Sequence, residues 1–217
     1  TVSVTTTDDD VAGFTIAETD GSTGVTEAGS TDLFTVVLDK APLSDVVFAI
    51  ASADTGEATV TSSLTFTSAN WDTPQNVTVT GVDDDIVDGS VTSTITVAIN
   101  DGSSDDNFDA VADQTVSVTT TDDDVAGFTI AETDGSTSVT EAGSTDLFTV
   151  VLNAQPATDV VVQFVSADTG EVTVTSLLTF TSANWDTAQT VTVTGVDEDF
   201  VDQDQITIIT ASILDVS

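Results

Sequence analysis

Carboxylates gather at a few fixed points of this sequence, and each point lies at the end of a strand-like run. Three adjacent aspartates at 122–124 follow the β-branched run 116–121, and the same triplet occurs at 8–10. Two like charges about 4 Å apart repel by about 4 kcal/mol at an effective dielectric of about 20. A folded protein therefore keeps such a triplet either in water or around a hard cation.

The charge of the chain limits the partners that it can have. The 217 residues include 38 acidic residues, a single basic residue (Lys40) and no His or Cys, which gives a formal net charge of -37. Hydrophobic residues still make up 39% of the chain, so this is not the composition of a disordered acidic tail. Nucleic acid, phosphorylated substrates and anionic membrane surfaces are all repelled. No apolar run approaches the roughly 18 residues of a transmembrane helix, so we expect no membrane insertion.

The residue types also limit the metals that the chain can hold. Zinc prefers His and Cys ligands, whereas calcium takes six to eight oxygen ligands from carboxylates and carbonyls. Magnesium requires a tighter octahedron and keeps several of its waters. The sequence offers oxygen ligands alone, and it offers them in groups. We therefore predict calcium at these groups; solvated acidic loops and a different ion are the alternatives.

The chain is a tandem repeat in which residue 1 corresponds to residue 115, an offset of 114 residues. Phe14 matches Phe128 and Trp71 matches Trp185, and the alignment needs no insertion up to the last residue. A period of this length is the size of one domain. We predict residues 1–10 to be the last strand of a preceding or neighbouring-chain repeat, 11–124 to be a first sandwich repeat, and 125–217 to be a second repeat that lacks its last strand. The chain would then be two periods cut from a longer array.

Each period is predicted to be an all-β sandwich. Val and Thr are abundant, helical periodicity is absent, and about seven strand-like runs follow one another at intervals of 10–15 residues, which is typical of a Greek-key sandwich of immunoglobulin type. In the first period these runs are 13–18, 33–38, 45–50, 64–66, 77–80, 94–99 and 116–121. A turn containing Pro42 joins the second run to the third, so we expect these two to be neighbouring antiparallel strands. The fold class is therefore tandem seven-stranded Greek-key immunoglobulin-like β-sandwiches joined end to end.

The segment 82–88 (Val-Asp-Asp-Asp-Ile-Val-Asp), together with the acidic triplet at 122–124 and the Ala-Gly-Phe at 126–128, resembles the Calx-beta domain. That family occurs in sodium–calcium exchangers, in an integrin subunit and in large bacterial surface proteins. The resemblance covers nearly the whole period, including 25–27 and 54–56. It implies a seven-stranded sandwich with a calcium cluster at the end where one domain meets the next.

The resemblance also implies a set of calcium ligands in each period. In the first they are Glu27, Asp54, Asp83, Asp84, the carbonyl of Ile86, Asp88, Asp122, Asp123 and Asp124. In the second they are Glu141, Asp168, Asp197, Glu198, the carbonyl of Phe200, and Asp202. Glu198 and Phe200 depart from the first period, and the second acidic triplet is missing. The triplet Asp8, Asp9 and Asp10 of another copy is a candidate to complete the second site.

The pattern favours a structural role over catalysis. Without His, Cys or Tyr, a serine nucleophile lacks its usual base, and every acid pair sits in a cluster that recurs in both periods. Our first hypothesis is a calcium-stiffened repeat segment of a bacterial extracellular adhesin, cell-surface or biofilm-matrix fibre protein. It would have neighbouring copies of the same repeat as partners, and it would assemble into a head-to-tail filament by strand complementation.

Two other functions remain open at this stage. One is a ligand-binding adhesion module, whose loops or Trp71 and Trp185 pockets would hold a glycan, ice or a host receptor; the alternative for both tryptophans is a place in the core. The other is a calcium sensor like the exchanger domains.

Overall fold

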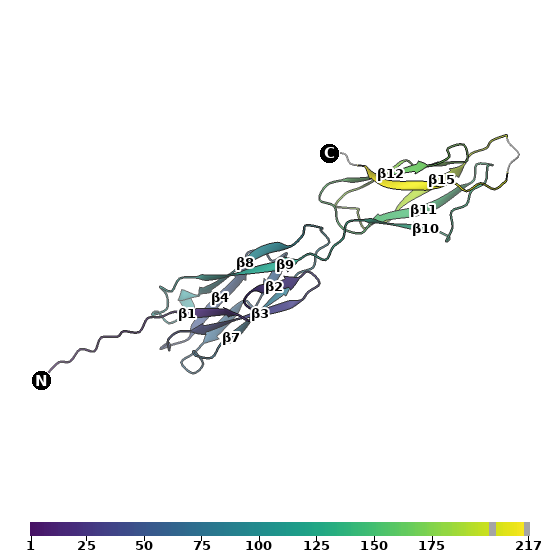
Figure 1. The fold of residues 1–217 in the computed structure, drawn as a ribbon. Coiled ribbons are helices and arrows are strands. Elements are labelled where there is room, and N and C mark those ends of the chain that lie inside the picture. The colour runs from purple at the N-terminus through teal and green to yellow at the C-terminus, as the bar shows by residue number, and fades with distance from the viewer. Residues whose placement is uncertain (200–202, 215–217) are drawn as a thin grey trace. The chain divides into compact units, whose positions relative to one another are not determined.

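The computed structural model describes residues 1–199 and 203–214 and is all-β, as predicted (Figure 1). The chain divides into two compact units, of which the first comprises 1–84 and 88–123 and the second comprises 85–87 and 124–217. No helix in the described part of the chain is long and apolar enough to cross a membrane. The predicted ligands Phe200 and Asp202 lie outside the described residues.

Two antiparallel-rich sheets form the first unit. One has the order β1-β3-β7-β5 and the other has the order β2-β9-β8-β4-β6. The strands are β1 (Phe14–Glu18), β2 (Thr23–Thr26), β3 (Thr31–Leu38), β4 (Val46–Ser52), β5 (Ala58–Val60), β6 (Ser63–Phe66), β7 (Gln75–Gly81), β8 (Val91–Ile99) and β9 (Gln114–Thr121), with a short 3-10 turn, η1 (Asp101–Ser103), after β8.

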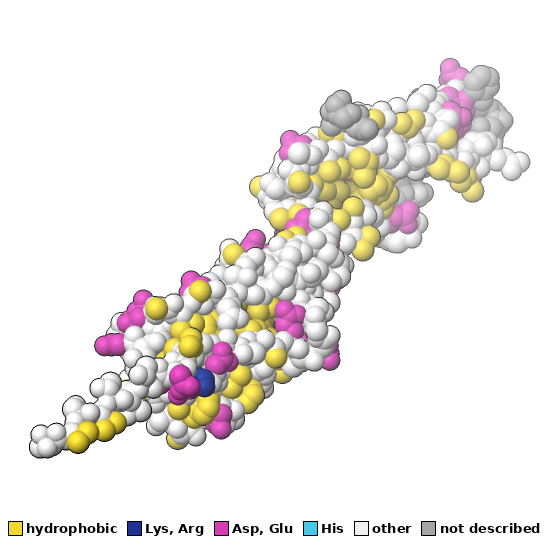
Figure 2. All heavy atoms as spheres, turned by 60° about the vertical axis from the view of Figure 1, so that its left-hand side comes forward, with side chains coloured by type: hydrophobic (Ala, Val, Ile, Leu, Met, Phe, Trp, Pro, Cys, Tyr) yellow, Lys and Arg dark blue, Asp and Glu magenta, His cyan; other side chains and the backbone are white. Residues whose placement is uncertain are grey.

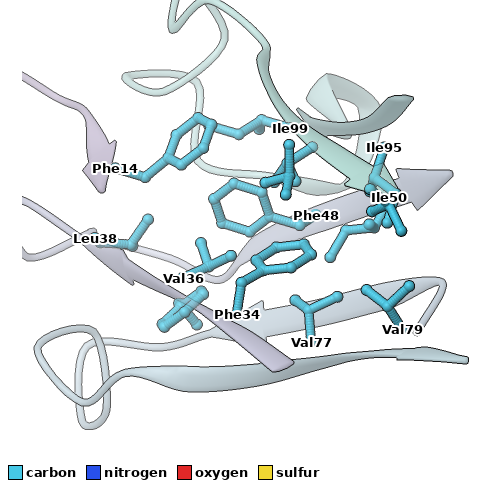
Figure 3. Packing of buried hydrophobic residues seen from close by; sticks show 14 of the residues in the cluster. Phe14, Phe34, Val36, Leu38, Phe48, Ile50, Val77, Val79, Ile95 and Ile99 are labelled. Atoms are coloured by element: carbon cyan, nitrogen blue, oxygen red, sulfur yellow. The ribbon is translucent and has the colours of Figure 1, made fainter. Parts of the chain in front are cut away.

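The core of the first unit lies between these two sheets (Figure 3). Alternate residues of β7, β8 and β9 are buried, which is the pattern of strands with one face on the core. Phe48 is central, because its ring meets those of Phe14 and Phe66 edge to face at centroid distances of 4.9 and 5.7 Å. Trp71 is half-buried and packs against the same cluster, as the core interpretation of the tryptophans expects.

The second unit also has two sheets, with the orders β10-β11-β15-β13 and β14-β12-β16. Its strands are β10 (Phe128–Glu132), β11 (Thr145–Leu152), β12 (Val160–Ser166), β13 (Val172–Val174), β14 (Leu177–Phe180), β15 (Gln189–Gly195) and β16 (Ile209–Leu214). The stretches 137–140 and 205–208 are not strands, although their counterparts in the first unit are β2 and the first part of β8.

One prediction of strand pairing is wrong. The runs 33–38 and 45–50 form β3 and β4, but these strands belong to different sheets. The connection around Pro42 is a crossover from one sheet to the other and not a hairpin, because β3 pairs with β1 and β7 while β4 pairs with β6 and β8.

The predicted number of seven strands is not confirmed, since the first unit has nine. The two that the sequence did not indicate, β2 and β5, have four and three residues. Such short segments show no clear alternation of apolar and polar residues. The Greek-key connectivity and the predicted domain boundaries stay predictions.

Gly81, the last residue of β7, permits a close approach between β7 and the end of β2. A Cβ atom at this position would collide with the backbone carbonyl of Thr26. The backbone N–H of Gly81 also donates to the carbonyl of Ser30 (3.0 Å), so neither segment is free to move away. Gly81 therefore fixes where β2 ends, directly before Glu27.

We expect Gly81→Ala to lower the free energy of unfolding of the first unit by about 1–3 kcal/mol, because backbone atoms cannot yield to the added methyl group as side chains can. Gly24→Ala in β2 is the matched control, since the nearest atom to its Cβ would lie at 3.8 Å, an ordinary contact. Urea unfolding of the two variants measures the difference, and equal effects would contradict this role of Gly81.

Candidate metal centre

Strand pairing positions Glu27 beside the end of β9. β2 runs parallel to β9, with Thr23 opposite Val118 and Thr26 opposite Thr121. The pairing continues one step further, since the backbone N–H of Glu27 donates to the carbonyl of Thr121 (3.1 Å). Glu27 therefore lies next to the point where the acidic triplet at 122–124 begins.

Glu57 approaches the same place from the other sheet. It directly precedes β5, and its carbonyl accepts hydrogen bonds from the backbone N–H of Val82 (2.9 Å) and from the hydroxyl of Thr120 (3.3 Å). The first donor follows β7 and the second belongs to β9, so Glu57 is held by both sheets. This arrangement fixes its side chain at the end of the sandwich where Glu27 lies.

The carboxylates of Glu27, Glu57 and Asp84 converge. One oxygen of each lies within 4.8 Å of the other two, and Glu27 also has an oxygen within 4.8 Å of one from Asp122. Only 1% of Glu27 and 7% of Glu57 is exposed to solvent, while Asp84 and Asp122 are half-buried. Glu27 is thus common to two neighbouring groupings, one with Glu57 and Asp84 and one with Asp122, and the four acids come from four segments of the first unit.

The two buried glutamates have carboxylate oxygens that the protein does not satisfy. Both oxygens of Glu27 and one oxygen of Glu57 are buried without a hydrogen-bond partner among the described residues. Burying an ionised carboxylate without a partner is costly, so such a group either takes up a proton or binds a cation. Their burial distinguishes this site from a solvated acidic loop.

The electrostatics of the site raise the pKa of both glutamates. Burial raises the pKa of Glu27 to about 7, with further contributions from the charges of Asp122, Asp84 and Asp88. The backbone N–H of Asp123 partly offsets this increase by lowering the pKa of Glu27. Its geometry does not meet the criteria of an ordinary hydrogen bond. Burial likewise raises the pKa of Glu57, followed by the charges of Asp88, Asp54 and Asp84.

The remaining predicted ligands of the first period lie around this group with varied roles. The carboxylate of Asp122 accepts a hydrogen bond from the backbone N–H of Gly89 (2.7 Å), which draws the loop after Asp88 toward β9. Asp54 is exposed and its carboxylate accepts from the backbone N–H of Gly56 (3.0 Å), so it closes its own loop. Other predicted ligands that are exposed in the first unit are Asp83, Asp88 and Asp123.

Two predicted ligands of the first period belong to the second unit. They are Asp124, which is half-buried, and Ile86, whose segment is joined to that unit by the hydrogen bond from the backbone N–H of Gln155 to the carbonyl of Asp85 (2.6 Å). Their roles as ligands stay predictions.

The acids of the second unit are not gathered in the same way. Glu141, Asp168 and Asp197 are exposed and Glu198 is half-buried. No described group of three acids in this unit brings its oxygens as close together as the first unit does. The reason is visible in the fold, because 137–140 is not paired with a neighbouring strand that would bury Glu141 as β9 buries Glu27.

The triplet at 8–10 lies on an exposed N-terminal arm. Asp8, Asp9 and Asp10 are all exposed, and Asp10 forms an ion pair with Lys40, the single cation of the sequence, seen in dark blue among acids in Figure 2. The Asp10 carboxylate raises the pKa of Lys40.

Glu57 is the member of the acidic group that the sequence did not indicate. The segment 54–56 contributes Asp54 to the predicted ligands, but the structure brings Glu57 into the group and leaves Asp54 exposed. The available signal was that Glu57 directly precedes an apolar strand residue, Ala58, and recurs as Glu171 before Val172. An acid that directly precedes a short strand in both periods is a candidate ligand.

Comparison with known proteins finds similarity at the level of structure only. No protein-family model matches the chain, and no curated protein matches it. Similar solved structures are CBD12 from CALX1.2 (17% identity, 84% of this chain, 76% of that chain, TM-score 0.37), the calcium binding domain CBD12 of CALX1.1 (16%, 85%, 76%, 0.34) and domains 5-6 of the S-layer protein SbsC (21%, 84%, 83%, 0.32). At these identities and TM-scores the likeness assigns neither a family nor a function.

The raised pKa of Glu27 predicts how stability depends on pH in the absence of divalent cations. In the folded protein the pKa of Glu27 is about 7, above the ordinary value of 4.5. At pH values between these two, Glu27 therefore holds a proton in the folded state that it has lost in the unfolded state. The free energy of unfolding should therefore fall by roughly 1–3 kcal/mol as pH rises from about 5 to about 8.

Urea unfolding in chelator at a series of pH values measures this slope. Glu27→Gln should flatten it, because the amide has no proton to lose, whereas Asp20→Asn in an exposed turn should leave it unchanged. A slope that is the same in all three proteins would show that Glu27 is not its source.

Proposed function

We propose that the first unit binds Ca²⁺ through Glu27, Glu57, Asp84 and Asp122, and that this ion stiffens a structural repeat. The observation that supports the proposal is the pair of buried glutamates with unsatisfied oxygens facing two further carboxylates. At an effective dielectric of about 20, each like-charged pair at this distance costs several kcal/mol, which is comparable with the whole stability of a domain. A divalent cation among these carboxylates replaces their net repulsion with net attraction.

The donor set fits calcium better than the other common ions. Calcium–oxygen distances are about 2.3–2.6 Å, so two oxygens on one ion are at most about 5 Å apart, and the oxygens of Glu27, Glu57 and Asp84 lie within that span of one another. Magnesium needs a regular octahedron and keeps most of its water, whereas four acids from four segments leave an irregular and partly closed site.

The ion would act as a clamp between the two sheets. Glu27 and Asp122 follow strands of the five-stranded sheet, whereas Glu57 and Asp84 flank strands of the four-stranded sheet. Without the cation, repulsion pushes apart the ends of the two sheets at this point. When calcium is bound, the same four segments are held together at this end of the sandwich. Because the ion binds only the folded state, that state gains about 2.7 kcal/mol when calcium exceeds Kd a hundredfold.

This role favours a non-enzymatic structural segment of a bacterial extracellular adhesin, surface or biofilm-matrix protein. In this proposal the acids hold the ends of the two sheets together and do not reach a substrate. A ligand-binding adhesion module is the second candidate. Trp71 argues against it, because its ring packs on the core and is not displayed as a platform for sugars.

Calcium should raise the melting temperature of the first unit. The measurement is thermal unfolding during a calcium titration that starts in chelator, followed by near-ultraviolet circular dichroism. Glu27→Gln and Glu57→Gln should each weaken apparent calcium affinity about tenfold or more, because each removes a charged ligand from a buried position.

Asp72→Asn is the matched control for these variants. It removes one charge from an exposed turn outside the acidic group and should leave the calcium response unchanged. A melting temperature that calcium does not change would overturn the proposed function.

A further inference from the structure

An open groove runs along the second unit between two stretches that are not strands. It is lined from one side by 137–142 and from the other by 204–207, and apolar side chains that include Ile130, Val139, Phe148 and Ile209 form its floor. Hydrophobic side chains are visible on the surface of this unit in Figure 2.

In the first unit the equivalent place is filled by β9. That strand pairs in parallel with β2 and antiparallel with β8, and these two strands correspond to the two walls of the groove. β9 therefore lies where the groove of the second unit is open. Its side chains bury the floor as well. Phe14, Val25, Ile95 and Val97 are buried in the first unit, whereas their counterparts Phe128, Val139, Ile209 and Ala211 are only half-buried in the second.

The chain carries a second copy of the sequence that fills this place. Residues 1–10 (Thr-Val-Ser-Val-Thr-Thr-Thr-Asp-Asp-Asp) are identical to 115–124, which comprise β9 from its second residue onward and the acidic triplet. In β9 the two valines are buried, with Val116 2% and Val118 0% exposed. In the arm Val2 is 91% and Val4 83% exposed, and residues 1–10 form no strand.

We propose that residues 1–10 of a second copy of this chain insert into the groove of the second unit, in the place that β9 occupies in the first unit. The inserted strand would pair in parallel with 137–140 and antiparallel with 205–210, as β9 does with β2 and β8. Its Val4 would lie opposite Thr137, as Val118 lies opposite Thr23. Its Ser3 would lie opposite Ile208, as Ser117 lies opposite Thr94. Each copy then offers one arm and one groove, so the contact is heterologous and builds a head-to-tail chain of copies.

The acidic end of the arm extends this inference to the metal, and this part rests on the proposed function. Asp8 corresponds to Asp122, so insertion would bring it next to Glu141 as Asp122 lies next to Glu27 in the first unit. Insertion would thereby assemble a second cluster of carboxylates, and calcium should favour the assembled form.

A pair of engineered cysteines tests the register directly. The chain has no cysteine of its own, so every disulfide in this variant forms between the thiols introduced by Ser3→Cys and Ile208→Cys, and the predicted register brings one of each together. Under oxidation in calcium we expect a ladder of products at multiples of 22.2 kDa on non-reducing gels. Ser3→Cys with Thr173→Cys is the matched control, because Thr173 is exposed on β13 in the other sheet and should give no ladder.

Variants of the arm separate strand insertion from random association. In the Ser3→Cys and Ile208→Cys background, adding Val2→Asp and Val4→Asp should abolish the ladder, because the two buried positions become charged. Val11→Asp, at a valine that is 76% exposed and follows the ten-residue arm, should leave it intact. The inference is overturned if no ladder forms, if the only product is a chain joined to itself, or if the control pair gives an equal ladder.

The same experiment distinguishes this inference from the calcium proposal. The cross-linking is repeated in chelator at about 0.5 M NaCl, where charge repulsion between copies is screened. A ladder under these conditions, combined with a melting temperature that calcium does not change, supports strand insertion and overturns the calcium site. Stabilisation by calcium without a ladder in either buffer overturns strand insertion and leaves the metal site standing.

Discussion

The pairing of β9 with β2 on one side and β8 on the other is the interaction on which the first unit depends. It adds a strand to one sheet, buries Val116 and Val118, and covers the residues at the edge of the core. β9 ends directly before Asp122, so the strand pairing also determines where the acidic group lies. The second unit shows the same sequence pattern without that strand, and there Val139 is half-buried and Glu141 is exposed.

The acidic group illustrates how a fold can hold a destabilising feature. Glu27 and Glu57 are placed by backbone hydrogen bonds that do not involve their carboxylates, so the backbone forces these side chains together whatever their charge. The repulsion is then relieved by a proton, as the raised pKa of Glu27 shows, or by a cation. If calcium binds as proposed, the stability of the repeat depends on the calcium concentration around it.

Much of the fold followed from local patterns, and the failures have identifiable causes. The alternation of Val and Thr along β7, β8 and β9 predicted strands with one buried face, and the structure confirms an all-β chain. Neither β2 nor β5 was predicted, because each is too short to show a period. The pairing of β3 with β4 was wrong because proximity in sequence suggested a hairpin, whereas the choice between a hairpin and a crossover depends on which sheet each strand joins.

By itself the sequence determined the repeat, the absence of nitrogen and sulfur ligands, and the placing of acids at strand ends, since these are properties of residue types and their spacing. Only the tertiary structure decided which acids meet. It brought in Glu57 from the opposite sheet, left Asp54 exposed, and separated Glu27 from its equivalent Glu141 by the presence or absence of one neighbouring strand. Burial is the physical reason, because long-range strand pairing decides which carboxylates lose their contact with water, and no local pattern records that pairing.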